Sequence, residues 1–238
     1  MLADLELGVL YTLAISSVSV YGVLFAGWSA NSKYAFLGSM RAAASMVSYE
    51  LILSSAVLTV ILLSGTFNYI GITEAQEAVW YIVPLLPIAL LFFISILAET
   101  NRTPFDLVEA ESELVSGFMT EHAGIVFVFF FLGEYCSIVL ISGFACFIFL
   151  GGYNIPELVV NNTFINLQAI ILAIKTCVIC FMFVWIRGTL PRIRWDGLIM
   201  LCWTKLLPMS IAFILLVPSI LVSFDVAPYL FPSTSIYL

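Results

Sequence analysis

Charged side chains are scarce in this chain of 238 residues. Only 10% of the residues are charged, and there is one histidine, His122. The sequence also lacks a Gly-rich phosphate loop, a nucleophile elbow and a dinucleotide-binding fingerprint. These absences argue against a nucleotide-binding enzyme or a serine hydrolase, and we expect no nucleic-acid partner.

Residues that could hold a metal are also few. All five cysteines lie within or beside apolar segments, and the CxxC formed by Cys177 and Cys180 falls inside an apolar run. A zinc or iron–sulfur site needs further ligands nearby, and this part of the sequence offers none. We therefore expect no metal site.

The chain is instead rich in long apolar runs. It is 63% hydrophobic, with a mean hydropathy of +1.14. Crossing a hydrocarbon core of about 30 Å takes about 20 apolar residues in a helix. Six runs reach that length, at residues 7–27, 43–64, 80–98, 124–150, 165–186 and 206–224. Strand-like alternation is absent, so the sequence predicts an all-α, polytopic membrane helix bundle, a single lipid-embedded domain over residues 1–238.

The lysines and arginines predict the orientation of this bundle. Seven of the eight fall near the ends of the first, third and fifth runs, and Lys175 lies inside the fifth. Basic residues mark the cytoplasmic or matrix side of a membrane protein. We therefore expect Lys33, Arg102 and Arg192 on that side, and Glu74, Glu157 and the tail after residue 225 on the other.

One acidic segment stands between the third and fourth runs. Residues 98–114 contain five carboxylates and one arginine, next to a membrane helix. Charge near hydrocarbon is costly, and such clusters mark proton or ligand sites. A solvated acidic loop is the other interpretation. Thr103 and Pro104 predict the start of a helix in this segment, with Thr103 as its N-cap.

Three ionisable residues lie inside the apolar runs: Glu50, Glu134 and Lys175. A charge at the centre of a membrane helix costs roughly 2.5–3.5 kcal/mol on insertion scales, so each needs a partner, water or neutralisation. One interpretation is a buried ion pair between Glu134 and Lys175. The other is a proton path that starts with Glu99 at the surface, passes Glu50 and reaches Glu134 at the greatest depth.

Five motifs carry a resemblance to one protein family. They are AGWSANSKY at residues 26–34, SYE at 48–50, AETNRTPFDLVEAESE at 98–113, FLGEY at 131–135 and RGTLPRIRWD at 187–196. Together they span nearly the whole chain, and each resembles a motif of subunit 1 of respiratory NADH:ubiquinone oxidoreductase (complex I). The acidic segment matches its counterpart almost residue for residue.

The resemblance implies a function. The chain would be a membrane subunit of a proton-pumping NADH:ubiquinone reductase, without a redox centre or bound cofactor of its own. It would help to form the chamber for the substrate ubiquinone with two hydrophilic-arm subunits, and pass protons toward antiporter-like membrane subunits. Its location would be the mitochondrial inner membrane or, alternatively, a bacterial plasma membrane. The other function considered is ion coupling in a related membrane-bound hydrogenase or another quinone-free complex.

The resemblance also assigns residues. The quinone-chamber residues would be Arg41, Glu99, Arg102, Phe105, Asp106, Glu109, Glu111, Glu113, Arg192, Arg194 and Asp196. The proton path would contain Glu50, Glu121 and Glu134, and Lys175 is added because it lies inside a membrane run.

The chain departs from the family at several points. The family has eight helices, and the first two are missing here, so we expect a separate partner chain that supplies them. His122 and Trp195 each replace a tyrosine, and Gly197 replaces a glutamine. The lysine that directly follows the tryptophan in the family is displaced by one position to Lys205.

Overall fold

A computed structural model describes residues 5–102, 104–105, 122–154 and 168–224. Within these ranges the secondary structure is helical, which confirms the predicted all-α class. The helices are α1 (Gly8–Ser29), α2 (Lys33–Ser64), α3 (Tyr69–Ala75), α4 (Leu86–Glu99), α6 (Ile125–Phe149), α7 (Gln168–Thr189), α8 (Trp195–Leu201), the π-helical turn η3 (Cys202–Leu206) and α9 (Leu207–Ser223).

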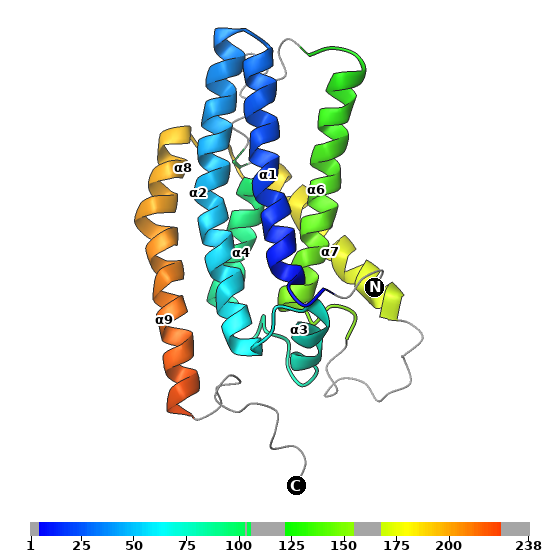
Figure 1. Cartoon of the computed structure of the whole chain (residues 1–238), viewed down its shortest axis with the longest axis vertical. Helices are drawn as coiled ribbons and strands as arrows, with labels where there is room; N and C mark the ends of the chain where they lie inside the picture. The colour runs from blue at the N-terminus through cyan, green and yellow to red at the C-terminus, as the bar shows by residue number, and fades with distance from the viewer. Residues whose placement is uncertain (1–4, 103, 106–121, 155–167, 225–238) are drawn as a thin grey trace.

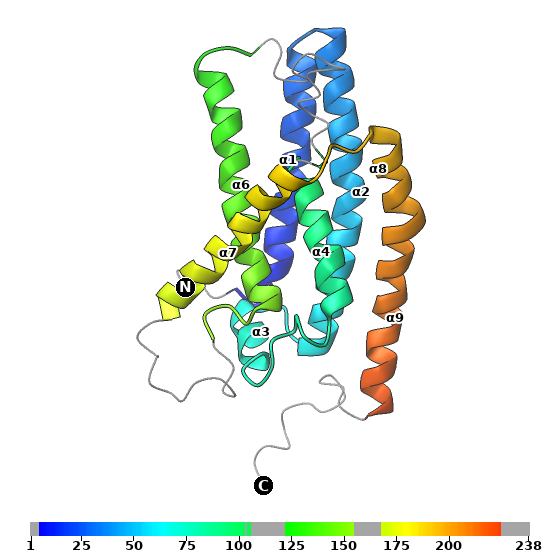
Figure 2. The same cartoon turned by 180° about the vertical axis from the view of Figure 1, so that it is seen from behind.

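The helices form an elongated bundle around α2 (Figures 1 and 2). The central helix α2 packs against α1, α4 and α9, and α6 packs against α7. Seen from behind, α7 crosses α6 obliquely. We call the end of the bundle that contains α3 the α3 end, and the opposite end, with the turn between α1 and α2, the turn end.

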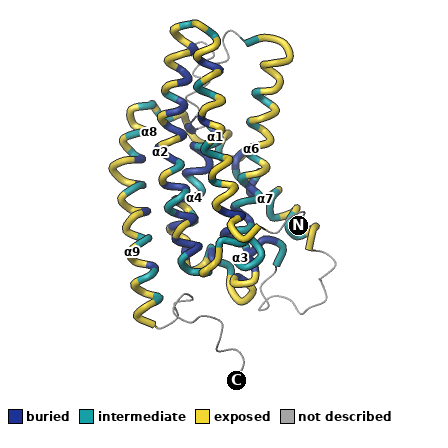
Figure 3. The backbone as a smooth tube through the Cα atoms, viewed as in Figure 1, coloured by how far each residue is buried: buried dark blue, intermediate teal, exposed yellow. Residues whose placement is uncertain are grey.

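The buried core lies between α2 and α4, while most of α6, α7 and α9 is exposed (Figure 3). Tyr49, Ile52, Ile88 and Phe92 are almost fully buried in this core. The exposed helices carry mainly apolar side chains, which suit contact with lipid rather than water. Among the described residues, five helical segments are long and apolar enough to cross a membrane: α1, α2, α6, α7 and the continuous stretch from α8 to α9.

Helix α2 is ten residues longer than the sequence predicts, because it starts at Lys33 and not at residue 43. The backbone N–H of Ala35 donates to the Ser32 hydroxyl oxygen at 3.2 Å, which caps the helix start. A search for apolar runs cannot detect this polar first part, which contains Lys33 and Arg41. A similar difference appears near the carboxyl end, where the helix begins at Trp195 rather than at residue 206.

Helix α4 is shorter than predicted, and this matters for the site. Residues 81–85 form turns, and the helix begins only at Leu86, with a proline in its first turn. Pro84 and Pro87 lack an N–H and cannot continue a helix through this stretch. With 14 residues, α4 is about 21 Å long at 1.5 Å per residue, too short to cross the hydrocarbon core. The acidic segment therefore begins inside the bundle.

Two residues of the predicted charge alternation lie at opposite ends of the bundle, whereas Arg102, predicted on the basic side, is buried inside it. Lys33 starts α2 at the turn end, and Glu74 lies in α3 at the other end. Glu157 and the tail after residue 225 lie outside the described residues. Which end faces the matrix stays a prediction from the basic loops.

We expect Gly27→Ala to destabilise the protein. A Cβ built on Gly27 would overlap the Ser39 side chain and approach the Ala35 carbonyl oxygen to 2.9 Å, so α1 and α2 would have to separate. Overpacking of this kind costs about 1–3 kcal/mol. Gly22→Ala on the same helix is the control, because nothing lies within 4 Å of its added Cβ. Thermal unfolding of the detergent-solubilised complex should show a lower midpoint for Gly27→Ala alone; equal midpoints would contradict the close contact.

Candidate functional site

Helix α4 ends inside the protein in a tight turn. The Thr100 hydroxyl donates to the carbonyl oxygens of Ile96 and Leu97 at 3.0 and 3.2 Å, and Asn101 adopts a left-handed conformation with φ of 50°. This turn leaves Arg102 buried and one carboxylate oxygen of Glu99 without solvent contact. The expectation that Glu99 lies at the surface is therefore wrong, because α4 ends before it reaches a membrane face.

Arg102 is paired with Glu134 of α6. Its Nε lies 2.8 Å from Oε1 of Glu134, and the two side chains are only 9% and 17% exposed. The guanidinium carbon of Arg102 also lies 4.7 Å from the centre of the Tyr135 ring, a cation–π distance. A residue predicted for the quinone chamber and one predicted for the proton path thus form one ion pair.

Two more side chains approach the Glu99 carboxylate. Glu50 of α2 is close enough to act on it electrostatically, and Ser16 of α1 is placed to hydrogen-bond to it. When both are ionised, the carboxylates of Glu50 and Glu99 repel each other. This repulsion disfavours a state in which both carry a negative charge. Glu50, Glu99 and Glu134 therefore lie in one region of the bundle. They are not arranged at increasing depth from the surface, as the sequence analysis predicted.

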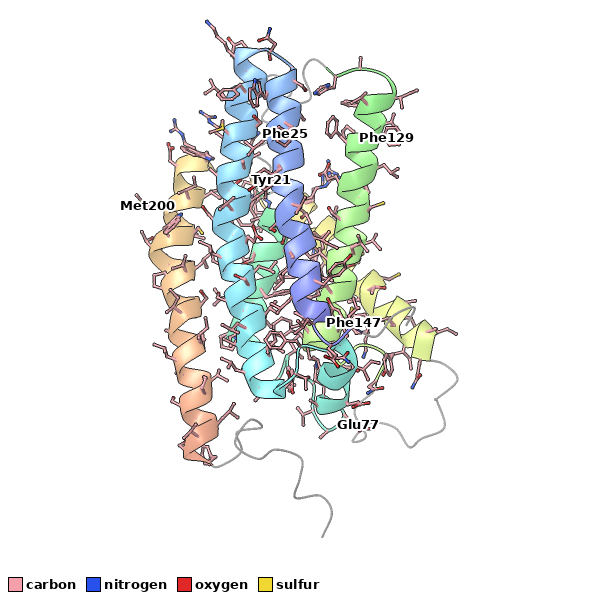
Figure 4. All side chains as sticks on the ribbon, viewed as in Figure 1. Tyr21, Phe25, Glu77, Phe129, Phe147 and Met200 are labelled. Atoms are coloured by element: carbon pink, nitrogen blue, oxygen red, sulfur yellow. The ribbon has the colours of Figure 1, made fainter. Side chains whose placement is uncertain are left out.

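A cavity of about 1030 Å³ connects this group with the space between α1 and α6. Its lining is mostly apolar, with polar side chains from α1, the end of α4, α6 and α7. Glu99 and Glu134 both reach it, as do the hydroxyls of Ser16, Ser19 and Ser137. Tyr21, Phe25 and Phe129 mark the two helices that border this region in Figure 4. Polar groups that meet in a large apolar cavity are typical of binding sites.

Two further motifs pack against the start of the acidic segment. The rings of Tyr49 and Phe105 lie 5.7 Å apart, and the Tyr49 hydroxyl donates to the Leu198 carbonyl oxygen at 3.3 Å. The backbone N–H of Ile193 donates to the Pro104 carbonyl oxygen at 3.1 Å. The motifs at residues 48–50, 98–113 and 187–196 therefore meet in one place, although they are far apart in the sequence.

The remaining predicted chamber residues are less buried. Arg192, Arg194 and Asp196 are exposed, and Arg194 Nε lies 3.9 Å from Asp196 Oδ2. Arg41 is half-buried, with its guanidinium 5.6 Å from the centre of the Trp195 ring.

Part of the predicted site cannot be placed. Asp106, Glu109, Glu111, Glu113 and Glu121 lie outside the described residues. Pro104 and Phe105 form a turn and a bend, so the helix predicted from Pro104 does not begin there.

Lys175 does not pair with Glu134, contrary to one of the two interpretations. Its ammonium nitrogen donates to the carbonyl oxygens of Leu150, Gly152 and Asn154 at 2.7, 2.8 and 2.7 Å. These oxygens lie at and just after the carboxyl end of α6, so Lys175 is held near the α3 end. The interpretation of a Glu134–Lys175 ion pair is wrong because Arg102 contacts Glu134 instead. The short helix α4 places Arg102 in the middle of the bundle.

Sequence reasoning missed three side chains. Tyr135 is the aromatic partner of Arg102, Ser16 faces Glu99, and Gln76 is fully buried near Lys175. Tyr135 could have been found, since it directly follows Glu134 in the FLGEY motif. The other two are single polar residues in apolar surroundings, without a spacing that signals their role. His122, which the sequence left open, has its Nε2 3.2 Å from the Ala26 carbonyl oxygen.

Comparison with known proteins agrees with the motifs. The family model described as NADH dehydrogenase matches residues 1–218. NADH-ubiquinone oxidoreductase chain 1 of Mycosarcoma maydis is 65% identical over 96% of this chain and 70% of the relative. Chain 1 of Neurospora crassa is 51% identical over 95% and 70%. A bacterial relative, a subunit of the NADH-quinone oxidoreductase of Rhodospirillum centenum, is 49% identical over 95% and 67%. The chain therefore belongs to the NADH dehydrogenase family.

Proposed function

We propose that the ion pair between Arg102 and Glu134 joins the ubiquinone chamber of complex I to its proton path. The chain is a membrane subunit of this respiratory enzyme complex and a multi-pass protein of the mitochondrial inner membrane. The hydrogenase alternative is not favoured, because the relatives are named as oxidoreductases of ubiquinone or quinone. The observation that carries the proposal is the 2.8 Å contact between the two side chains.

The chamber side of the proposal comprises Arg41, Glu99, Arg102 and Phe105, with the exposed Arg192, Arg194 and Asp196 bracing the acidic segment. Reduction of ubiquinone to ubiquinol takes up two electrons and two protons, so charge changes at the chamber during each turnover. Arg102 lies at the start of the acidic segment and touches Glu134. A change of charge in that segment therefore changes the electrostatic field at Glu134 over a short distance in a medium of low polarity.

The proton side comprises Glu50, Glu99 and Glu134, with Glu121 as a further candidate. Buried carboxylates that share a cavity can exchange protons through each other, hydroxyl groups or water. Ser16, Ser19 and Ser137 supply such hydroxyls next to Glu99 and Glu134. The group thus places several proton-binding and hydroxyl groups between the proposed chamber and the space between α1 and α6.

The partners follow from this role. We infer that two hydrophilic-arm subunits complete the chamber from the acidic-segment side, and that antiporter-like membrane subunits receive the protons. Ubiquinone is the substrate at the shared interface, and lipid covers the apolar outer faces of a single membrane domain. The exposed apolar side chains of α1, such as Tyr11 and Val18, belong to these outer faces.

Arg102→Lys tests the proposal. Lysine keeps the charge but lacks the planar group that lies over Tyr135 and the Nε next to Glu134. Because displacements of about 1 Å can cost up to 100-fold in rate, we expect NADH:ubiquinone reduction to fall by roughly tenfold or more. Electron transfer from NADH to a soluble acceptor, which does not use the chamber, should be unchanged. The matched control is Arg187→Lys, at an exposed position. Unchanged ubiquinone reduction in a fully assembled Arg102→Lys complex would remove Arg102 from the chamber.

A further inference from the structure

Lys175 occupies a cage of backbone oxygens. Its three hydrogen bonds, to Leu150, Gly152 and Asn154, use all three protons of an ammonium group. The nitrogen also lies 4.6 Å from the centre of the Trp80 ring, on the face that attracts cations. Each of these contacts favours the charged form of the side chain.

Gln76 completes the same structure. Its Nε2 donates to the carbonyl oxygens of Phe147 and Ile148 at 3.0 and 3.2 Å, and its Oε1 accepts from the N–H of Gly151 at 3.0 Å. Gly151 and Gly152 have φ of 66° and 53°, a conformation that suits glycine. A Cβ on Gly151 would lie 2.9 Å from the Trp80 ring, so the turn fits tightly under that ring.

This cage lies directly behind the wall of the cavity. Thr176, next to Lys175, and Phe147, whose carbonyl oxygen binds Gln76, both line the cavity. Tyr69 lines it too, and its ring lies 5.6 Å from Phe147 and 6.2 Å from Phe144. Figure 4 shows Phe147 between the middle of the bundle and Glu77 at the α3 end. From Glu134 toward the α3 end, the cavity is thus bordered by aromatic rings, and the Lys175 ammonium lies behind that wall rather than in the lining.

We propose that Lys175 closes the α3 end of the cavity to protons, so that protons held by Glu50, Glu99 and Glu134 cannot cross to that face. This inference rests on the proposed proton role of those carboxylates. Under this proposal Lys175 does not carry protons but blocks them. Such a block is needed because a path open at both ends would let the proton gradient collapse.

The Lys175 ammonium can block protons because it fills a position that water or a hydronium ion would otherwise occupy. Three carbonyl oxygens that point at one spot would bind water or a hydronium ion if that spot were free. The ammonium takes this place with a charge that repels protons, as fixed positive groups do in membrane pores. A structural cap of α6 would need the hydrogen bonds but not the charge, and this difference can be tested.

Lys175→Gln keeps hydrogen-bond donors and removes the charge, whereas Lys175→Arg keeps both. The purified complex is reconstituted in liposomes, a pH gradient is imposed without NADH or ubiquinone, and its decay is followed with a pH-sensitive dye. Loss of one nearby charge should speed the decay by on the order of tenfold in Lys175→Gln. Lys175→Arg should match the unmodified complex. So should Lys205→Gln, the same change at an exposed site. Equal decay in all four samples would overturn the proposal.

A second variant, Lys175→His, tests the proposal even if the Lys175→Gln complex does not assemble. Lys175→His keeps a ring N–H donor and carries its charge only below a pKa of about 6.5 in a model peptide. Among the described residues, the titratable groups near this position include the thiols of Cys146 and Cys180 and the hydroxyl of Tyr153, and these stay unchanged. Decay in Lys175→His, relative to the unmodified complex, should be faster at pH 8 than at pH 5.5; an equal ratio at both would refute the role of charge. Because no turnover is involved, this result is independent of the Arg102→Lys test.

Discussion

Replacing either Arg102 or Glu134 with glutamine should sharply reduce the amount of assembled complex, and replacing both should restore it. Both side chains are almost buried, so each single replacement breaks an ion pair and leaves the other charge inside the bundle without this counter-charge. The penalty for such a charge is about 3–5 kcal/mol, a large fraction of the roughly 5–15 kcal/mol that stabilises a typical domain. The double variant removes both charges and therefore this penalty.

Quantitative gel analysis of the native complex measures this double-mutant cycle. The coupling between the two sites should be strong, whereas Arg187→Gln combined with Glu134→Gln should show additive effects, because Arg187 is exposed. Restored assembly in the double variant must not restore proton pumping, since a glutamine at position 134 cannot exchange a proton. A double variant that assembles and pumps normally would show that the pair is structural only.

Glu50→Gln should leave assembly intact and stop the coupled reaction. Glu50 is half-buried and lies near Glu99, with which it shares negative charge rather than a stabilising ion pair. Glutamine keeps its shape and hydrogen bonds but cannot carry a proton. A positioned proton-transfer group contributes roughly 10²–10⁴-fold to a rate, so we expect ubiquinone-coupled turnover to fall by about a hundredfold.

The matched control for Glu50→Gln is Glu74→Gln, an exposed position in α3 at the α3 end. It changes the same chemical group outside the cavity and should leave turnover unchanged. Loss of activity in both variants would indicate a general effect of lost negative charge rather than a proton path through Glu50.

Much of the helical arrangement could be predicted from apolar runs alone. The run at residues 124–150 corresponds closely to α6, Ile125–Phe149, because nearly every position in it is compatible with lipid. Helix α2 was predicted too short because its first part carries Lys33 and Arg41, which a count of apolar residues excludes. Helix α4 was predicted too long because the run at residues 80–98 includes Pro84 and Pro87, whose effect on the backbone outweighs their neighbours' hydropathy.

The sequence predicted which residues belong to the site but not which of them form the ion pair. Motifs identified Glu50, Glu99, Arg102 and Glu134, yet the ion pair considered as one of two interpretations joined Glu134 to Lys175 and not to Arg102. That choice followed from equal depth along two helices, which assumes that both start at a membrane face. The real partner depends on α4 ending inside the bundle at the left-handed Asn101, a tertiary feature. The cage around Lys175 depends on the backbone after α6, which hydropathy does not describe.

The most direct test of the account measures two rates in proteoliposomes that contain the Glu50→Gln complex: the rate of ubiquinone reduction and the rate of proton pumping. Assembly and NADH oxidation by a soluble acceptor are verified first. The account predicts that ubiquinone reduction and proton pumping fall together, while the Glu74→Gln complex keeps both. Normal ubiquinone reduction with normal proton pumping in the assembled Glu50→Gln complex would contradict the claim that the buried carboxylates connect the chamber to the proton path.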